Sequence, residues 1–374
     1  MENKKLKIAF FGSSIVSAYW NGAATYYRGI VKALHKMGHE VTFYEPDIYE
    51  RQKHRDIDDP DWCEVIVYEK DEVSLRGLLR KASEEADVII KASGVGAFDE
   101  LLEKEVAHMK KDDNLVIFWD VDAPATLDRI ESDDKDPFRE LIPLYDLVLT
   151  YGGGQPVIDA YERNGAKKCI PIYNALDTDT HFPVESEDKF EAALAFLGNR
   201  LPDREKRVEE FFIKPAENLP EKRFLLGGSG WGDKQMPENI TYFGHVYTKD
   251  HNAFNSTPMA VLNISRDSMA RYGFSPATRV FEAAGSAACI ITDYWKGIET
   301  FFEPDKEIIV AKDGAEVEKI LSELTAEKAK EIGKAAYKKV LAEHTYQHRA
   351  ELLERVMSRR LEHEKEPNKE SVKS

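Results

Sequence analysis

Short apolar runs alternate with amphipathic segments along the first half of the chain. Residues Lys7–Gly12 (KIAFFG) predict a buried strand, and the spacing of Ile30, Val31 and Leu34 predicts a helix over Asn21–Met37. Further strands are predicted at Glu40–Tyr44, Val65–Tyr68, Asp87–Lys91, Leu115–Trp119, Asp146–Thr150 and Lys168–Ile172, with helices at Leu75–Glu85 and Phe98–Met109. This alternation indicates a parallel sheet with helices on both faces.

The pattern is interrupted by a polar stretch over Asn174–Lys189 and then starts again. A helix is predicted over Asp203–Phe212 with Asp203 as its N-cap, and another over Ala277–Ser286. The remaining elements are strands at Leu194–Leu197, Arg223–Leu226, Thr241–Phe243, Met259–Ile264, Ala288–Thr292 and Glu307–Val310, and helices at Gly314–Leu324, Glu327–Glu343 and His348–Leu361. We therefore expect an α/β fold of two Rossmann-like domains, 1–178 and 179–345, whose parallel sheets share a central cleft. A terminal helix at 346–361 and a disordered tail at 362–374 complete the predicted organisation.

Composition narrows the function classes. The 374 residues suit two domains. The net charge of −16 argues against a broad nucleic-acid or anionic-membrane surface. Three scattered cysteines form neither a disulfide framework nor a zinc site, and the ten histidines show no metal-ligand spacing. No apolar run has the length of a transmembrane segment, and Met1 to Lys7 lacks a signal-peptide core, so we expect a cytoplasmic protein without a bound metal.

Two glycine-containing segments follow predicted strands of the second half. In Gly198–Arg204 (GNRLPDR), Arg200 and Arg204 at a helix start suit a diphosphate, although two surface arginines on a capped helix would look the same. Gly227–Gly232 (GGSGWG) favours close backbone approach to a ligand or simply a flexible loop. It does not match the dinucleotide-binding fingerprint, which disfavours a dehydrogenase.

The segment Asn263–Phe302 carries the densest candidate chemistry. Arg266 follows the buried strand Met259–Ile264, a loop containing Ser275 comes next, and the following helix carries Arg279 and Glu282 on one face. An arginine there can neutralise a phosphate, and a carboxylate near a helix start can accept both hydroxyls of a ribose. The alternative is a surface ion pair of little energetic value.

The first half offers candidates for a second ligand. Asn21, Gly22 and Arg28 follow the first strand, and Gly94 and Gly153 follow two others, so that a ligand could approach the backbone closely there.

Two aspartates follow the strand Leu115–Trp119. Asp120 and Asp122 lie at its carboxyl end, where a carboxylate can act as general base on a hydroxyl group. Equally, they can be turn or N-cap residues ahead of Pro124.

The stretch RVFEAAG (Arg279–Gly285) with TDYWKGIETFFEP (Thr292–Pro304) resembles the glycosyl transferases group 1 pattern, and more closely its CgeB-like (spore-maturation-protein-like) branch. Pieces of both halves share the resemblance, which extends roughly from Lys7 to Leu353. They are NGAATYYRGI (Asn21–Ile30), KASGVG (Lys91–Gly96), WDVDAPAT (Trp119–Thr126), TYGGGQPVIDAY (Thr150–Tyr161), IPIYNALD (Ile170–Asp177) and FLGNRLPDR (Phe196–Arg204).

The resemblance implies a GT-B fold, with the acceptor on the N-terminal domain and a nucleoside diphosphate sugar on the C-terminal domain. It implies no required cofactor or metal, and a C-terminal helix that packs back toward the N-terminal domain. The implied donor-binding residues are Arg200, Arg204, Arg266, Ser275, Arg279 and Glu282. One departure is Phe274, which stands eight residues before Glu282 where the group carries a glutamate that contacts the sugar. This departure leaves the sugar and the stereochemical outcome open.

We therefore expect a metal-independent, hexosyltransferase-like glycosyltransferase. By resemblance, retention of configuration is favoured. The acceptor could be a glycan, a protein or a small molecule. Two alternatives stay open: a non-catalytic GT-B protein that binds sugar nucleotides or glycans, and a sugar-nucleotide epimerase of the same fold.

Overall fold

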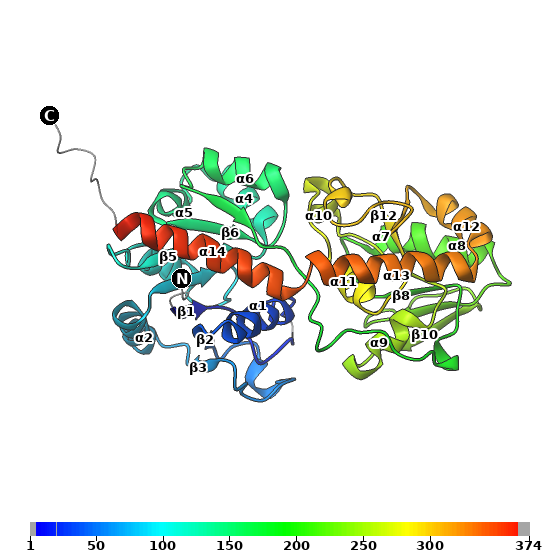
Figure 1. Ribbon diagram of the computed structural model, residues 1–374, viewed down its shortest axis with the longest axis horizontal. Coiled ribbons are helices and arrows are strands. Elements are labelled where there is room, and N and C mark those ends of the chain that lie inside the picture. Colours follow the sequence, from blue (N-terminus) through cyan, green and yellow to red (C-terminus); the bar gives the residue numbers. More distant parts are fainter. Residues whose placement is uncertain (1–4, 20, 366–374) are drawn as a thin grey trace. The chain divides into compact units, whose positions relative to one another are not determined.

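The chain forms two compact α/β units. The computed structural model describes residues 5–19 and 21–365. Residues 1–4 of the charged N-terminal segment and 366–374 of the predicted tail lie outside the described residues. The first unit consists of the chain up to Tyr173 together with the segment from Tyr346, and the second unit is Asn174–Thr345. Each unit has its own sheet with helices packed on it (Figure 1).

The sheet of the first unit has seven strands, all parallel, in the order β3-β2-β1-β4-β5-β6-β7. The strands are β1 (Lys7–Phe11), β2 (Glu40–Pro46), β3 (Glu64–Tyr68), β4 (Val88–Ala92), β5 (Leu115–Asp120), β6 (Leu147–Thr150) and β7 (Cys169–Pro171). The central strands β4 and β5 are buried along their whole length. Burial on both faces explains why these strands are apolar runs rather than alternating patterns.

Helices cover this sheet, and the last helix of the chain belongs to it. They are α1 (Ala24–Lys36), α2 (Glu72–Glu85), α3 (Asp99–Ala107), α4 (Ala123–Ser132), α5 (Phe138–Leu141), α6 (Gly154–Arg163) and α14 (Tyr346–Lys365). Helix α14 lies against α1: a Cβ placed on Gly29 would come within 2.2 Å of the Tyr346 ring (Figure 1). Near the middle of α14, Glu354 accepts a hydrogen bond from Nε2 of the buried His39, at 3.1 Å. The terminal helix thus packs on the N-terminal unit, and it continues to Lys365 rather than ending at 361.

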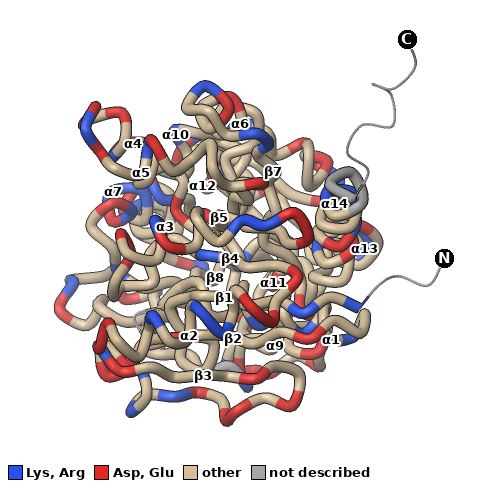
Figure 2. Tube along the Cα trace, turned by 90° about the vertical axis from the view of Figure 1, so that its left-hand side faces the viewer, with Lys and Arg blue, Asp and Glu red and all other residues tan. Residues whose placement is uncertain are grey.

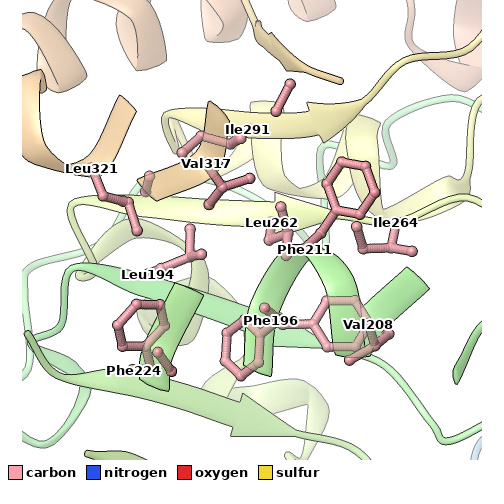
Figure 3. Close-up of a cluster of buried hydrophobic side chains, with 14 of the residues drawn as sticks. Leu194, Phe196, Val208, Phe211, Phe224, Leu262, Ile264, Ile291, Val317 and Leu321 are labelled. Atoms are coloured by element: carbon pink, nitrogen blue, oxygen red, sulfur yellow. The ribbon is translucent and has the colours of Figure 1, made fainter. Parts of the chain in front are cut away.

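The sheet of the second unit has six parallel strands in the order β10-β9-β8-β11-β12-β13. They are β8 (Leu194–Leu197), β9 (Phe224–Gly227), β10 (Ile240–Gly244), β11 (Ala260–Asn263), β12 (Ile290–Asp293) and β13 (Ile309–Ala311). Figure 3 shows side chains of β8, β11 and β12 meeting those of the covering helices in one apolar core. Phe196 of β8 belongs to this core and lies one residue before the last residue of its strand.

Three helical elements of the second unit were not expected from the sequence pattern: the π-helix η4 (Glu209–Ile213) and the helices α9 (Thr248–Ser256) and α10 (Asp267–Tyr272). The other α-helices are α7 (Glu205–Val208), α8 (Lys214–Asn218), α11 (Thr278–Gly285), α12 (Gly314–Glu323) and α13 (Ala326–Glu343). The prediction of Asp203 as an N-cap is wrong, because α7 begins after Arg204 and the Asp203 carboxylate accepts from Arg266 Nε at 2.7 Å. Helix α10 lies in the stretch predicted as a polar loop, and α9 in a stretch left without an element.

Charged side chains are distributed over the elements of the N-terminal unit. Figure 2 shows Lys and Arg positions interspersed with Asp and Glu positions along its strands and helices rather than gathered on one of them. Among the residues that the structure describes, no helix is long and apolar enough to cross a membrane.

Candidate functional site

Two arginines converge at the carboxyl end of β8. A Cβ placed on Gly198 would lie 2.9 Å from Nη2 of Arg204 and 3.1 Å from Nη1 of Arg279. Both guanidinium carbons also lie 5.5 Å from the centroid of the Phe196 ring. The side chains therefore come from two elements, the loop before α7 and the first turn of α11. Two like charges held this close repel each other, so the arrangement favours an anion between them.

The Arg204 side chain is only 6% exposed. Its Nη2 donates to the Asn199 carbonyl oxygen, while its Nε has no hydrogen-bond partner among the described residues. Burial, followed by the neighbouring Arg279 charge, lowers the pKa of Arg204 to about 9. Within the described chain no carboxylate lies at ion-pair distance from Arg204. A buried cation in this state is costly by itself, and a bound anion would offset the cost.

The other predicted donor-site arginines are engaged by carboxylates. Arg200 binds Glu205 at 2.7 Å and Asp233 at 2.9 Å, and its guanidinium lies 5.9 Å from the Trp231 ring centroid. Arg266 binds Asp203 at 2.7 Å. The structure thus brings Arg204 and Arg279 together and holds Arg200 and Arg266 in ion pairs beside them.

Helix α11 places Glu282 one turn after Arg279. Both side chains line a small hollow of about 20 Å³, together with Asn255 and Asn263. The Oδ1 atom of the buried Asn263 has no hydrogen-bond partner among the described residues. The hollow is large enough for about one water molecule, which would satisfy such an acceptor. The rest of its lining is apolar, and it lies directly beside the two residues that the sequence indicates for a phosphate and a ribose.

Ser275 shapes the turn that leads into α11. Its hydroxyl donates to the Gly273 carbonyl oxygen at 2.9 Å, and the side chain is almost fully buried. The same turn holds Phe274 at φ +48, a left-handed conformation that is rare for a bulky residue. Its ring packs on Gly297, where a Cβ would lie 2.2 Å from it. Through its hydrogen bond to Gly273, Ser275 therefore stabilises the backbone turn that precedes α11.

The glycine-rich loop after β9 packs against the loop after β8. Gly228 has φ +117, and a Cβ on it would lie 2.3 Å from the Gly198 carbonyl oxygen. Trp231 Nε1 donates to the same oxygen at 2.8 Å, and the Asn199 side chain accepts from Ser229 N at 2.9 Å. The glycine at 228 is therefore required by loop–loop packing. This contact fixes the loop from which Arg204 projects.

His251 was not predicted as a site residue. It lies on α9 with its Nε2 donating to the Val246 carbonyl oxygen at 3.1 Å, because a carbonyl can only accept. Burial lowers its pKa, and the nearby negative charge of Glu282 opposes that shift. Only the packing of α9 beside α11 brings the two residues together: Ser286 Oγ donates to Asn252 Oδ1 at 3.1 Å. No short-range pattern in the sequence connects His251 with Glu282.

In the first unit, Asn21 and Arg28 hold the loop after β1. The Asn21 side chain donates to the Ser14 and Ser17 carbonyl oxygens and accepts from the Ser13 hydroxyl. Arg28 donates to the Ile15 carbonyl oxygen and forms two parallel hydrogen bonds with the Asp56 carboxylate. These contacts give both residues a structural role in shaping that loop.

The predicted close-approach glycines differ in what surrounds them. Neither Gly22 nor Gly94 has an atom within 4 Å of a hypothetical Cβ, and Gly94 has φ +63. A Cβ on Gly153, at φ +91, would lie 2.1 Å from a Val157 methyl group. Gly153 is therefore required by its own helix α6, whereas Gly22 and Gly94 leave open space beside the backbone.

Asp120 is fully buried at the end of β5. Its carboxylate accepts hydrogen bonds from the Ser93 hydroxyl at 2.7 Å, Asp122 N at 3.0 Å and the Tyr161 hydroxyl at 2.5 Å. Burial, and then the Asp120 charge, raises the pKa of Tyr161 well above its usual value, so the phenol stays protonated as a donor. Asp122, by contrast, is exposed and immediately precedes α4.

Removal of the Tyr161 hydroxyl should therefore destabilise the protein. Tyr161→Phe deletes a donor to a buried carboxylate, and we expect a loss of about 2 kcal/mol in the free energy of unfolding. Tyr145→Phe is a matched control, because the Tyr145 hydroxyl donates to the neutral Glu103 carbonyl oxygen and its loss should cost about 1 kcal/mol. Urea denaturation measures both values. Equal losses in the two variants would contradict a charged hydrogen bond at Asp120.

No group of three His, Cys, Asp or Glu side chains within residues 5–19 and 21–365 is arranged to hold a metal ion. The candidate chemistry of the described chain thus consists of the Arg204–Arg279 pair with Glu282 in one unit and the aspartates after β5 in the other.

Comparisons with known proteins connect this arrangement to a fold. A family model described as glycosyl transferase-like matches residues 204–355. A sucrose-phosphate synthase from Thermosynechococcus elongatus is similar in structure, with 14% identity, coverage of 96% of this chain and 100% of that chain, and a TM-score of 0.67. Two further structures are similar over 95% of this chain and 100% of their own chains. They are Anabaena HepE in complex with UDP-glucose (13% identity, TM-score 0.65) and an alpha-glucosyltransferase in complex with UDP-glucose and DNA containing an abasic site (12% identity, TM-score 0.69). The fold is GT-B. No curated protein sequence gives a significant match to the chain.

Within the GT-B fold, the matched segment contains the whole of α11 and both arginines of the pair. The parallel sheets of seven and six strands confirm the two α/β domains predicted from the sequence pattern and the GT-B fold that the family resemblance implies. The comparisons support the glycosyl transferases group 1 resemblance in this segment, while the CgeB-like branch stays a prediction.

Proposed function

We propose that the chain is a glycosyltransferase that moves a hexose from a nucleoside diphosphate sugar to an acceptor hydroxyl. The observation that carries this proposal is the Arg204–Arg279 pair, two guanidinium groups gathered over one ring at the end of a strand. A diphosphate would place negatively charged oxygens beside both guanidinium groups. Two of the similar GT-B structures contain UDP-glucose, which supports this class of ligand.

The chemistry requires charge stabilisation on the leaving group. When the bond between the sugar carbon and the phosphate oxygen breaks, its electron pair stays on the diphosphate. Arg204 and Arg279 would stabilise that developing charge, which is the task that a metal ion performs in other enzymes. We therefore propose metal-independent transfer. The N–H groups at the start of α11 would add their partial positive charge.

The proton on the acceptor hydroxyl has two possible destinations. For inversion of configuration we propose Asp122 as general base, with Asp120 positioning it through the hydrogen bond to its backbone N–H. For retention, which the family resemblance favours, an oxygen of the leaving phosphate can take the proton. In that case no protein base is needed.

We propose that Glu282 binds the ribose of the donor. Wild type should bind the preferred nucleoside diphosphate about tenfold more tightly than its 2′,3′-dideoxy analogue, because a charged hydrogen bond is worth about 1.5 kcal/mol or more. Glu282→Ala should bind both ligands with the weaker affinity. Isothermal titration with UDP, GDP, ADP, CDP and TDP first identifies the base, and the analogue then gives the ratio.

The ratio is informative because each variant serves as its own control for folding. If Glu282→Ala keeps the wild-type preference for the ribose ligand, the ribose assignment is wrong. If no nucleoside diphosphate binds wild type at millimolar concentration, the glycosyltransferase proposal itself fails, and a structural role gains support.

A further inference from the structure

Three loops of the N-terminal unit meet at one edge of its sheet. Strands β2, β1 and β4 are adjacent and parallel, so their carboxyl ends point to the same edge. The loop after β1 is joined to the loop after β2 by Arg51 Nη1, which donates to the Ser13 carbonyl oxygen at 3.0 Å, and by Ser17 Oγ, which donates to the His54 carbonyl oxygen at 2.7 Å. The loop after β4 touches the same surface at Gly96.

A buried carboxylate makes this edge rigid. Glu45, at the end of β2, is completely buried and accepts hydrogen bonds from the Ser14 hydroxyl, Ile15 N and the Gln52 amide at 2.6 to 2.8 Å. One side chain thereby ties two of the loops together. Side chains carried by these hydrogen-bonded loops have a defined position before any ligand binds, which reduces the entropy cost of binding.

Tyr49 is displayed on this edge at a conformational cost. Its side chain is 61% exposed, and both Tyr49 (φ 54) and Glu50 (φ 57) lie in the left-handed region that non-glycine residues avoid. A Cβ on Gly96 would lie only 3.0 Å from the Tyr49 ring, and the Arg51 guanidinium lies 5.2 Å from its centroid. Strain of this kind persists where the surroundings hold it, and it is concentrated at ligand-binding sites.

A second aromatic surface lies on the same edge. The Tyr19 ring stacks on His54 with the ring centroids 4.1 Å apart and an interplanar angle of 25°, and Tyr19 remains 40% exposed. A single exposed ring needs no explanation, but here two aromatic surfaces lie on one edge whose loops are held together by hydrogen bonds.

The charges around these rings distinguish between classes of ligand. Residues 47–61 contain six acidic residues and three basic ones, a net charge of −3, and the acidic residues Asp47 and Glu50 directly flank the Tyr49 turn. This balance disfavours phosphorylated, sulfated or nucleic-acid ligands. Carboxylates accept hydrogen bonds from hydroxyl groups, and the electron-rich face of an aromatic ring attracts the weakly positive C–H groups on the face of a sugar ring.

We infer that this aromatic rim, defined as Tyr19, Tyr49 and His54, binds a neutral carbohydrate, which is the acceptor of the transfer reaction. The role of this carbohydrate as the acceptor rests on the proposed glycosyltransferase function. Binding of the carbohydrate at the rim can be tested without any reaction.

The test is saturation-transfer NMR on the full-length protein with maltotriose, cellotriose, chitotriose and mannotriose as probes. Wild type is expected to transfer saturation to at least one of them, with the strongest signals on ring C–H protons. Tyr49→Phe keeps the ring and should keep the signal, whereas Tyr49→Ala should weaken binding at least tenfold. Leu144→Ala is a control, since Leu144 is exposed just before β6 begins, at the amino ends of the strands.

Tyr49→Gly separates binding from folding. Glycine adopts φ 54 without strain, so this variant should melt at or above the wild-type temperature and still lose the carbohydrate signal. A loss of signal in Tyr49→Ala and Tyr49→Gly, with retention in Tyr49→Phe and Leu144→Ala, supports the site.

Three outcomes would overturn the inference: none of the four trisaccharides binds wild type, binding survives in Tyr49→Gly, or only an anionic hyaluronan tetrasaccharide or free 4-nitrophenol binds. Titration of the same samples with nucleoside diphosphates tells the two proposals apart. Nucleotide binding without carbohydrate binding would refute the rim alone, and the reverse would refute the donor site alone.

Discussion

Arg204→Met is expected to raise the melting temperature of the ligand-free protein and to abolish most of its stabilisation by nucleoside diphosphates. The wild-type guanidinium is buried, is repelled by Arg279 and has no carboxylate at ion-pair distance in the described chain, so its charge opposes folding. A methionine of similar length removes that cost and still packs on Phe196. We expect a gain on the order of 1 kcal/mol, which for a unit of this size corresponds to about 2–4 °C.

The same change should weaken binding of a nucleoside diphosphate by about 10- to 150-fold, because a hydrogen bond between charged groups contributes about 1.5–3 kcal/mol. Differential scanning fluorimetry with and without ligand measures both effects. Higher stability with lower affinity is the pattern of a residue that is retained for binding.

Arg207→Met is the matched control. Arg207 donates to Asp293, a completely buried carboxylate, and its removal would leave that charge without its ion-pair partner. The same substitution should therefore lower the melting temperature, with a loss of about 3 kcal/mol or more. If both arginine variants destabilise the protein equally, Arg204 serves as an ordinary structural residue and the account of the pair is wrong.

Gly228→Ala is expected to be among the most destabilising single changes in the second unit. The residue has φ +117, and the new Cβ would lie 2.3 Å from the backbone oxygen of Gly198. Backbone strain of about 1–2 kcal/mol and overpacking of about 1–3 kcal/mol give a loss of roughly 3 kcal/mol. That loss corresponds to about 6–12 °C in melting temperature. The displaced loop carries Asn199, whose carbonyl oxygen holds Arg204, so ligand binding should weaken as well.

Gly244→Ala separates the two causes. Gly244 has φ +65, and no atom lies within 4 Å of a Cβ placed on it. This variant should therefore lose only the strain energy, about 1 kcal/mol. If Gly228→Ala is no more destabilising than Gly244→Ala, the two loops separate easily, and the rigid support proposed for the arginine pair is absent.

The strands and the larger helices could be predicted because burial determines their sequences. Runs such as VIIKA in β4 and AVLN in β11 have few alternatives to a buried strand between helices. The helices that could not be predicted lack clear capping residues and a regular apolar pattern in their own sequences. Helix α9 (TKDHNAFNS) has neither a side-chain hydrogen bond from its N-cap residue nor a regular apolar stripe, and packing against α11 stabilises it instead.

The candidate site was predictable only in part, because pairing depends on residues that are remote in sequence. Arg200 and Arg204 look equivalent in GNRLPDR, yet Asp233, 33 residues away, engages one of them, while the approach of Arg279 places the other in a cation pair. The local sequence favours Asp203 as an N-cap, but its carboxylate binds Arg266, 63 residues later, instead. The environment of Asp120 likewise depends on Ser93 and Tyr161, which no local pattern links to it.

The most direct test of the central claim is a calorimetric titration of wild type and Arg204→Met/Arg279→Met with the nucleoside, its monophosphate and its diphosphate, using the base that binds best. The account predicts a large gain in wild-type affinity when the second phosphate is added, and no such gain in the double variant. Equal affinity of wild type for the mono- and diphosphate, or a gain that persists without the two arginines, would contradict a diphosphate site between Arg204 and Arg279.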